Sequence, residues 1–121
     1  MVSGVSLLGL RTGIISKVPA NDLGSYIQNR VRFCGVSDDY LVYDKSKDSR
    51  LGIYYYEYGA HPRKPNVIYD RKNTAFTDIT IDNFQEEMFH AARCFHTTGI
   101  TLALGQKTRK TAIEMIQRFK E

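Results

Sequence analysis

The sequence lacks the features that mark several specialised classes of protein. It has two cysteines, Cys34 and Cys94, without C-x-x-C spacing and without a histidine at ligand spacing. This argues against a disulfide framework and a structural metal site, and we expect both cysteines to be reduced core residues. No stretch approaches eighteen consecutive apolar residues, so no membrane span is predicted. The apolar start has no preceding basic region and no cleavage site of small residues, which favours a cytoplasmic protein.

Long runs of one charge are also absent. The net charge is +4 and the pI near 9.1, yet the basic residues are scattered along the chain. Binding to nucleic acid is therefore allowed but not required. Apolar residues make up 42% of the 121 residues and charged residues 25%, which is ordinary for one soluble globular domain with a real core.

The first third of the chain reads as a helix, a strand and a second helix. Val2 to Leu8 is apolar and ends at Gly9, as expected of a helix with a glycine C-cap. The segment from Arg11 to Lys17 predicts a buried strand that stops at Pro19. The segment from Asp22 to Gly35 predicts a helix with its N-cap and its C-terminal glycine at these two ends.

The middle of the chain is rich in tyrosine and alternates between apolar and polar residues. The runs Tyr40 to Tyr43, Leu51 to Tyr58 and Asn66 to Arg71 are punctuated by glycine and proline. Alternation with a period of two predicts an antiparallel hairpin here, in a sheet separate from the main one.

The last third predicts two helices around a strand. Thr80 should cap a helix that carries Phe84 and Met88 on one stripe, Cys94 to Thr98 reads as a second buried strand, and Lys107 to Glu121 is amphipathic. Strands that alternate with helices predict a parallel sheet, and two core strands alone would leave its edges open. We therefore expect one incomplete α/β domain over residues 1–121, with a small antiparallel β lid at about 50–72.

Two segments carry the chemistry. In the first, residues 67–75, Tyr69 and Arg71 stand two positions apart and so lie on the same side of a strand, whereas Asp70 faces the other side. An aromatic hydroxyl beside a guanidinium suits a hydroxylated ligand that carries a carboxylate. In the second, residues 95–101, a buried strand breaks into a polar glycine turn.

Together with LGLRTG at 8–13, NDLGSYI at 21–27 and GVS at 35–37, these segments resemble the ribokinase (PfkB) carbohydrate kinases in their order along the chain. The resemblance is strongest to the 2-keto-3-deoxygluconate kinases. It implies an incomplete ribokinase-like, Rossmann-type sheet with the β lid. It also implies that Tyr54, Tyr69 and Arg71 bind the substrate and that residues 96–101 border the substrate cleft.

The same resemblance implies the activity of the intact enzyme, which would use ATP and Mg²⁺ to phosphorylate 2-keto-3-deoxygluconate to its 6-phosphate. The family's N-terminal G-G, its D-x-N-x-R segment and its G-A-G-D motif with the catalytic aspartate do not occur in this sequence. We therefore assign no catalytic residue, no cofactor site and no metal site to this chain, and we expect it to be inactive by itself. Family members often pair through their lids, so the resemblance implies a homodimer. We expect no nucleic-acid partner and no membrane partner.

Two other interpretations compete with a kinase. The first is a non-catalytic basic α/β module that binds nucleic acid or another polyanion through basic residues interleaved with tyrosines, namely Arg50, Arg63, Lys64, Arg71 and Lys72. Its binding would weaken steeply as salt rises. The second is a scaffold or regulatory fragment that retains only the lid contacts, which would dimerise without responding to a ligand.

Overall fold

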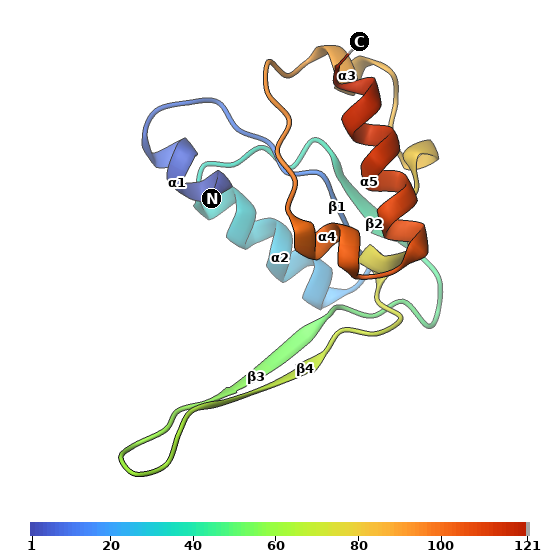
Figure 1. The fold of residues 1–121 in the computed structure, drawn as a ribbon. Coiled ribbons are helices and arrows are strands. Elements are labelled where there is room, and N and C mark those ends of the chain that lie inside the picture. The colour runs from blue at the N-terminus through green and yellow to red at the C-terminus, as the bar shows by residue number, and fades with distance from the viewer. Residues whose placement is uncertain (121) are drawn as a thin grey trace.

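The structure is a computed structural model that describes residues 1–120 (Figure 1). Its elements form a body of helices around a pair of strands, from which a long hairpin projects. In chain order they are α1 (Val2–Leu7), β1 (Ser16–Pro19), α2 (Asp22–Phe33), β2 (Leu41–Asp44), β3 (Ile53–Glu57), β4 (Asn66–Asp70), the 3-10 turns η1 (Ala75–Asp78) and η2 (Ile81–Asn83), α3 (Glu87–His90), α4 (Gly99–Ala103) and α5 (Gln106–Arg118).

The body is built on β1 and β2, which pair in parallel with Ser16 opposite Leu41 and Pro19 opposite Asp44. Helix α2 connects them, and α2 and α5 flank the strand pair in Figure 1. The expectation that residues 40–43 belong to the antiparallel sheet is wrong. Leu41 is buried and Tyr40 packs against the core cluster, so this segment serves the main core despite its tyrosine-rich sequence. The predicted α/β class, with a partial parallel sheet and a small antiparallel sheet, is confirmed.

Helix α2 begins at a tight junction with β1. The side chain of Asn21 accepts hydrogen bonds from the backbone N–H groups of Leu23 and Gly24 at 3.1 and 3.2 Å. Asn21 is therefore the N-cap, one residue before the predicted Asp22. A Cβ atom on Gly24 would lie 1.9 Å from the carbonyl oxygen of Pro19, so the close approach of helix and strand requires glycine.

The first helix matches its prediction, and the last one does so except at its C-terminal end. Helix α1 ends just before Gly9, whose φ of +87° is the left-handed conformation that a C-terminal glycine provides. Helix α5 runs from Gln106 to Arg118 with Phe119 as its C-cap, so it ends before the predicted Glu121, which itself lies outside the described residues.

Residues 80–90 do not form the single helix expected from their apolar stripe. A capping box between Thr80 and Asn83 starts η2, in which Asn83 accepts from the backbone N–H of Thr80 at 3.0 Å, and η2 ends after three residues. Phe84 then takes an extended conformation, with φ −127° and ψ 144°, before α3 resumes for four residues. This break lets the segment turn so that Met88 and Phe89 enter the core beside Met115.

Residues 94–98 form no strand, which corrects the second buried strand of the prediction. Phe95 is covered instead by the ring of Phe119, stacked at 4.5 Å with an interplanar angle of 5°. Both cysteines are free, but only Cys34 is partly buried, and Cys94 is exposed rather than a core residue.

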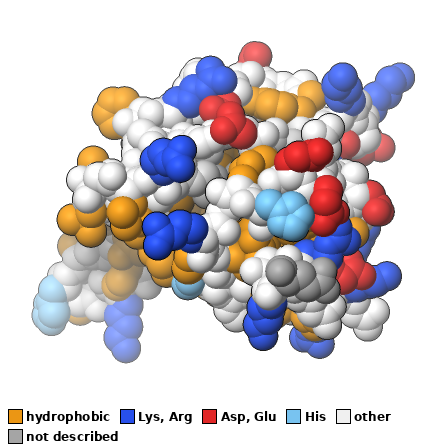
Figure 2. Space-filling model, turned by 90° about the horizontal axis from the view of Figure 1, so that it is seen from above, with side chains coloured by type: hydrophobic (Ala, Val, Ile, Leu, Met, Phe, Trp, Pro, Cys, Tyr) orange, Lys and Arg blue, Asp and Glu red, His pale blue; other side chains and the backbone are white. Residues whose placement is uncertain are grey.

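On the face drawn in Figure 2, side chains of different kinds are unevenly distributed, although basic ones lie on both sides. Figure 2 shows hydrophobic side chains on the side of α1, and acidic side chains among basic ones on the side of α5. The most exposed apolar residues of the body are Met1, Leu7, Leu8 and Phe33, each more than 70% accessible. Within residues 1–120, no helix combines the length and the apolar character needed to cross a membrane.

Candidate sugar-acid site at the base of the hairpin

The hairpin places its aromatic side chains on opposite sides in alternation. Strand β3 pairs with β4 in the antiparallel sense, and Tyr54 lies directly opposite Tyr69. Residues opposite one another share a face of the ribbon, and the two phenol rings lie 6.3 Å apart, tilted by 43°. Tyr55 and Ile68 form the next pair and occupy the other face.

Arg71 follows β4 and lies on the face of the two phenols. Its guanidinium stands over the ring of Tyr69, 4.5 Å from the ring centre, in a cation–π contact. Asp70 lies on the opposite face, where its carboxylate pairs with Arg50. The structure thus brings together Tyr54, Tyr69 and Arg71, the three residues chosen from the sequence, and keeps Asp70 apart from them.

Gly52 makes room for this arrangement. A Cβ atom at position 52 would lie 3.3 Å from the Cβ of Arg71 and 3.4 Å from a methyl carbon of Thr74. The first distance is tighter than an ordinary van der Waals contact, so a larger side chain would displace Arg71. The absence of a side chain at position 52 is therefore part of the site.

The three residues line a cleft of about 290 Å³ between the hairpin and the body. Its remaining walls come from β1, α2, the loop before β3, the segment around η1, and Leu104. The cleft is open, and Tyr54 and Tyr69 are 65% and 61% accessible. A second hollow, of about 370 Å³, lies on α5 alone, so no other element converges on it.

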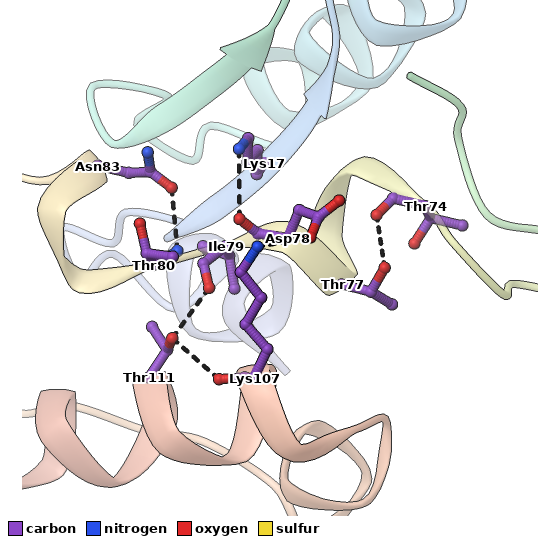
Figure 3. Close-up of polar contacts among 9 residues, drawn as sticks. All are labelled: Lys17, Thr74, Thr77, Asp78, Ile79, Thr80, Asn83, Lys107 and Thr111. Carbon is purple, nitrogen blue, oxygen red and sulfur yellow. Dashed lines mark hydrogen bonds and ion pairs between the residues drawn. The ribbon is translucent and has the colours of Figure 1, made fainter. Parts of the chain in front are cut away.

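The wall that faces the hairpin is fixed to α5 by a polar network (Figure 3). Lys17, which lines the cleft, donates from Nζ to the carbonyl oxygen of Asp78 at 3.3 Å. The carboxylate of Asp78 accepts from Lys107 Nζ at 2.6 Å, and Thr111 donates to the carbonyl oxygen of Ile79 at 2.9 Å. These contacts tie β1, η1 and α5 into one support for the cleft.

Sequence reasoning missed the residues that the body contributes to this wall, Lys17 and Thr77 among them. The sequence predicts Lys17 only as part of a buried strand, and the structure places it in the lining of the cleft. Residues 96–101 are expected to border the cleft, but none of them lines it. Residues 99–103 form α4, and only Leu104, the residue after this helix, reaches the cleft.

The basic cluster required by the nucleic-acid interpretation is divided in the structure. Arg50 pairs with Asp70, and Arg63 pairs with Glu57 near the tip of the hairpin. Arg71 lies in the cleft. Two of the five cations are thus neutralised by carboxylates.

The architecture defines a class of protein. A partial parallel α/β body that carries a small antiparallel sheet is a ribokinase-like fold, and the comparisons with carbohydrate kinases of known structure agree. No family profile matches the chain.

A 2-dehydro-3-deoxygalactonokinase of Haloferax volcanii is 38% identical over 116 residues, which cover 96% of this chain and 36% of that protein. The crystal structure of a PfkB family carbohydrate kinase from Listeria grayi superposes with a TM-score of 0.88 at 29% identity, covering 98% of this chain and 37% of that one. The crystal structure of 2-dehydro-3-deoxygluconokinase from Thermotoga maritima superposes with a TM-score of 0.85 at 31% identity, covering 96% of this chain and 35% of that one.

The chain is thus related over nearly its whole length to the PfkB-family carbohydrate kinases, 2-dehydro-3-deoxygluconokinases among them. It spans about a third of the length of the curated relatives that it matches. Other sugar kinases of the same fold, at 22% and 16% identity, were solved with ATP bound.

Proposed function

We propose that this chain is the substrate-binding portion of an ATP-dependent kinase that phosphorylates a 2-keto-3-deoxy sugar acid, 2-keto-3-deoxygluconate or a close relative, to its 6-phosphate. One observation carries the proposal: two phenols and a guanidinium from the hairpin line a single cleft with the body. Phenol hydroxyls suit the hydroxyl groups of a sugar, and a guanidinium suits the carboxylate of an acid.

The charge of Arg71 is available for such a ligand. Arg50 and Arg63, the other arginines of the hairpin region, each form a salt bridge, whereas Arg71 forms none within residues 1–120. Stacking on Tyr69 orients the planar guanidinium without using its hydrogen-bond donors. A carboxylate that meets this fork can form two charge-assisted hydrogen bonds.

The named relatives support the class of substrate. One is called a 2-dehydro-3-deoxygalactonokinase and another a 2-dehydro-3-deoxygluconokinase, and both names denote kinases of 2-keto-3-deoxy sugar acids. The two acids share the carboxylate and differ in the configuration of a hydroxyl group. We assign Arg71 to the shared carboxylate, and Tyr54 and Tyr69 to the hydroxyl groups.

ATP and Mg²⁺ belong to the intact enzyme in this proposal. The sequence contains no G-x-G-D segment that could supply a catalytic aspartate, and residues 1–121 correspond to about a third of a relative. We therefore expect this chain to bind the sugar acid but to transfer no phosphate by itself.

Pairing of two chains through the hairpin is part of the same proposal. Tyr55 and Ile68 are 57% and 59% accessible on the face away from the cleft, and a flat apolar ribbon of this kind favours association. Sedimentation of the chain should show a dimer that Tyr55→Glu converts to a monomer. A monomer at all concentrations would contradict the pairing.

Calorimetric titration tests the binding proposal directly. The chain should bind 2-keto-3-deoxygluconate and 2-keto-3-deoxygalactonate more tightly than the neutral sugar 2-deoxyglucose, because only the acids can pair with Arg71. Equal binding of acids and neutral sugar, or no binding at all, would refute the proposal. A single-stranded oligonucleotide in parallel titrations tests the polyanion interpretation, which predicts tight binding that falls steeply as salt rises.

A further inference from the structure

Arg50 links three parts of the chain at the point where the hairpin joins the body. Its guanidinium pairs with the carboxylate of Asp70 and donates through Nη1 to the carbonyl oxygen of Lys72 at 3.2 Å. Its own carbonyl oxygen accepts from the backbone N–H of Ala75 at 2.9 Å. Arg50 therefore fixes the end of β4 and the segment that carries Arg71.

Asp70 is a potential competitor for Arg71. The two residues are adjacent in sequence, and their side chains lie on opposite faces of the hairpin. The hydrogen bond and the charge of Asp70 raise the pKa of the Arg50 guanidinium, so the pair is electrostatically favourable in the folded chain. Without Arg50, the carboxylate of Asp70 would be an unpaired negative charge next to the residue that must attract an anion.

We propose that Arg50 is a positioning residue that pairs with the Asp70 carboxylate on the far face of the hairpin and thereby keeps this carboxylate from competing with a sugar acid for Arg71. The inference rests on the proposed function, and it names a residue outside the cleft that controls charge selectivity. Arg50 itself does not line the cleft, so its effect on a ligand passes through Asp70 and Arg71.

Three variants test this idea through the affinity of the chain for 2-keto-3-deoxygluconate. Arg50→Gln should weaken binding about five-fold, the equivalent of ~1 kcal/mol for the partly exposed pair. Asp70→Asn should bind as well as the unmodified chain, and the double variant R50Q/D70N should return to within about two-fold of it. Binding of 2-deoxyglucose should be the same in all variants.

Arg63→Gln is the matched control. Arg63 pairs with Glu57 on the same hairpin but away from the cleft, so removing this ion pair should leave the affinity unchanged. If R50Q binds like the unmodified chain, or if the double variant stays as weak as R50Q, the inference is overturned. A purely structural role of Arg50 would give that second result, because neutralising Asp70 does not restore the lost contacts.

A measurement without ligand separates this inference from the proposed function. The ring of Tyr69 should shift the NMR signals of the Arg71 side chain, since the guanidinium lies 4.5 Å from the ring centre. R50Q should reduce this shift as Asp70 draws Arg71 away, and R50Q/D70N should restore it. Failure of the unmodified chain to bind sugar acids would refute the proposed function, whereas an unchanged Arg71 signal in R50Q would refute the positioning role.

Discussion

Replacing Arg71 by glutamine tests the charge that the candidate site offers to its ligand. A charge-assisted hydrogen bond contributes about 1.5 to 3 kcal/mol. The ring beneath Arg71 belongs to Tyr69, which is 61% accessible, so the site is open to solvent. Solvent screening therefore places the bond between Arg71 and the ligand carboxylate at the lower end of this range, about 1.5 kcal/mol. R71Q should therefore weaken the binding of 2-keto-3-deoxygluconate about ten-fold. Arg71→Lys, which keeps the charge but loses the planar fork, should weaken it about three-fold.

Calorimetric titration of both variants, with 2-deoxyglucose as the neutral ligand, gives the required comparison. The neutral sugar should bind R71Q and the unmodified chain equally, because it has no carboxylate to lose a partner. Lys72→Gln is a matched control, since it removes one positive charge from the neighbouring residue, which does not line the cleft. Equal weakening of acid and neutral sugar by R71Q would show that Arg71 shapes the cleft, and would refute its role as the carboxylate contact.

Three further predictions concern the stability of the chain, measured by urea or thermal unfolding. Met88→Ala should lower the free energy of unfolding by about 2 to 5 kcal/mol, because Met88 is 2% accessible in the core cluster. Gly24→Ala should destabilise by more than about 2 kcal/mol, since its methyl group would collide with the Pro19 carbonyl; native-like stability would refute this. The hydrogen bond from Arg32 lowers the pKa of Asp38 from its usual 3.8. Asp38→Asn should therefore lower Tm at neutral pH, and the difference should vanish as pH falls through that lowered pKa; a difference that persists in acid would contradict it.

The parts of the fold that sequence reasoning predicted are those with strong local signals. Gly9 in the left-handed conformation ends α1, and the apolar spacing of residues 107–119 identifies α5. The hairpin followed from alternation and from the turn residues between its strands. In each case the residues that determine the structure are close neighbours in the sequence.

The parts that it missed depend on partners distant in sequence. The alternating, tyrosine-rich sequence around Tyr40 and Leu41 predicts a strand of the hairpin sheet, but the segment pairs with β1 and joins the parallel sheet. Phe95 was assigned to a strand because it is apolar, yet the ring of Phe119 covers it. In the candidate site, the two-residue spacing was enough to predict that Tyr69 and Arg71 lie side by side. That Lys17 lines the same cleft depends on how β1 packs against the hairpin, which the local sequence does not indicate.

Gly52 has a consequence for variation among related sequences. It binds nothing, and its φ does not lie in the left-handed region, so only the space taken by Arg71 and Thr74 excludes a side chain there. The near atom of Arg71 is its Cβ, which every residue except glycine has, so a relative that replaces the arginine keeps the reason for a glycine opposite it. Position 52 should therefore remain glycine when position 71 changes to another residue with a side chain, and a family alignment in which such relatives carry larger residues at position 52 would show that the two segments are not held this close.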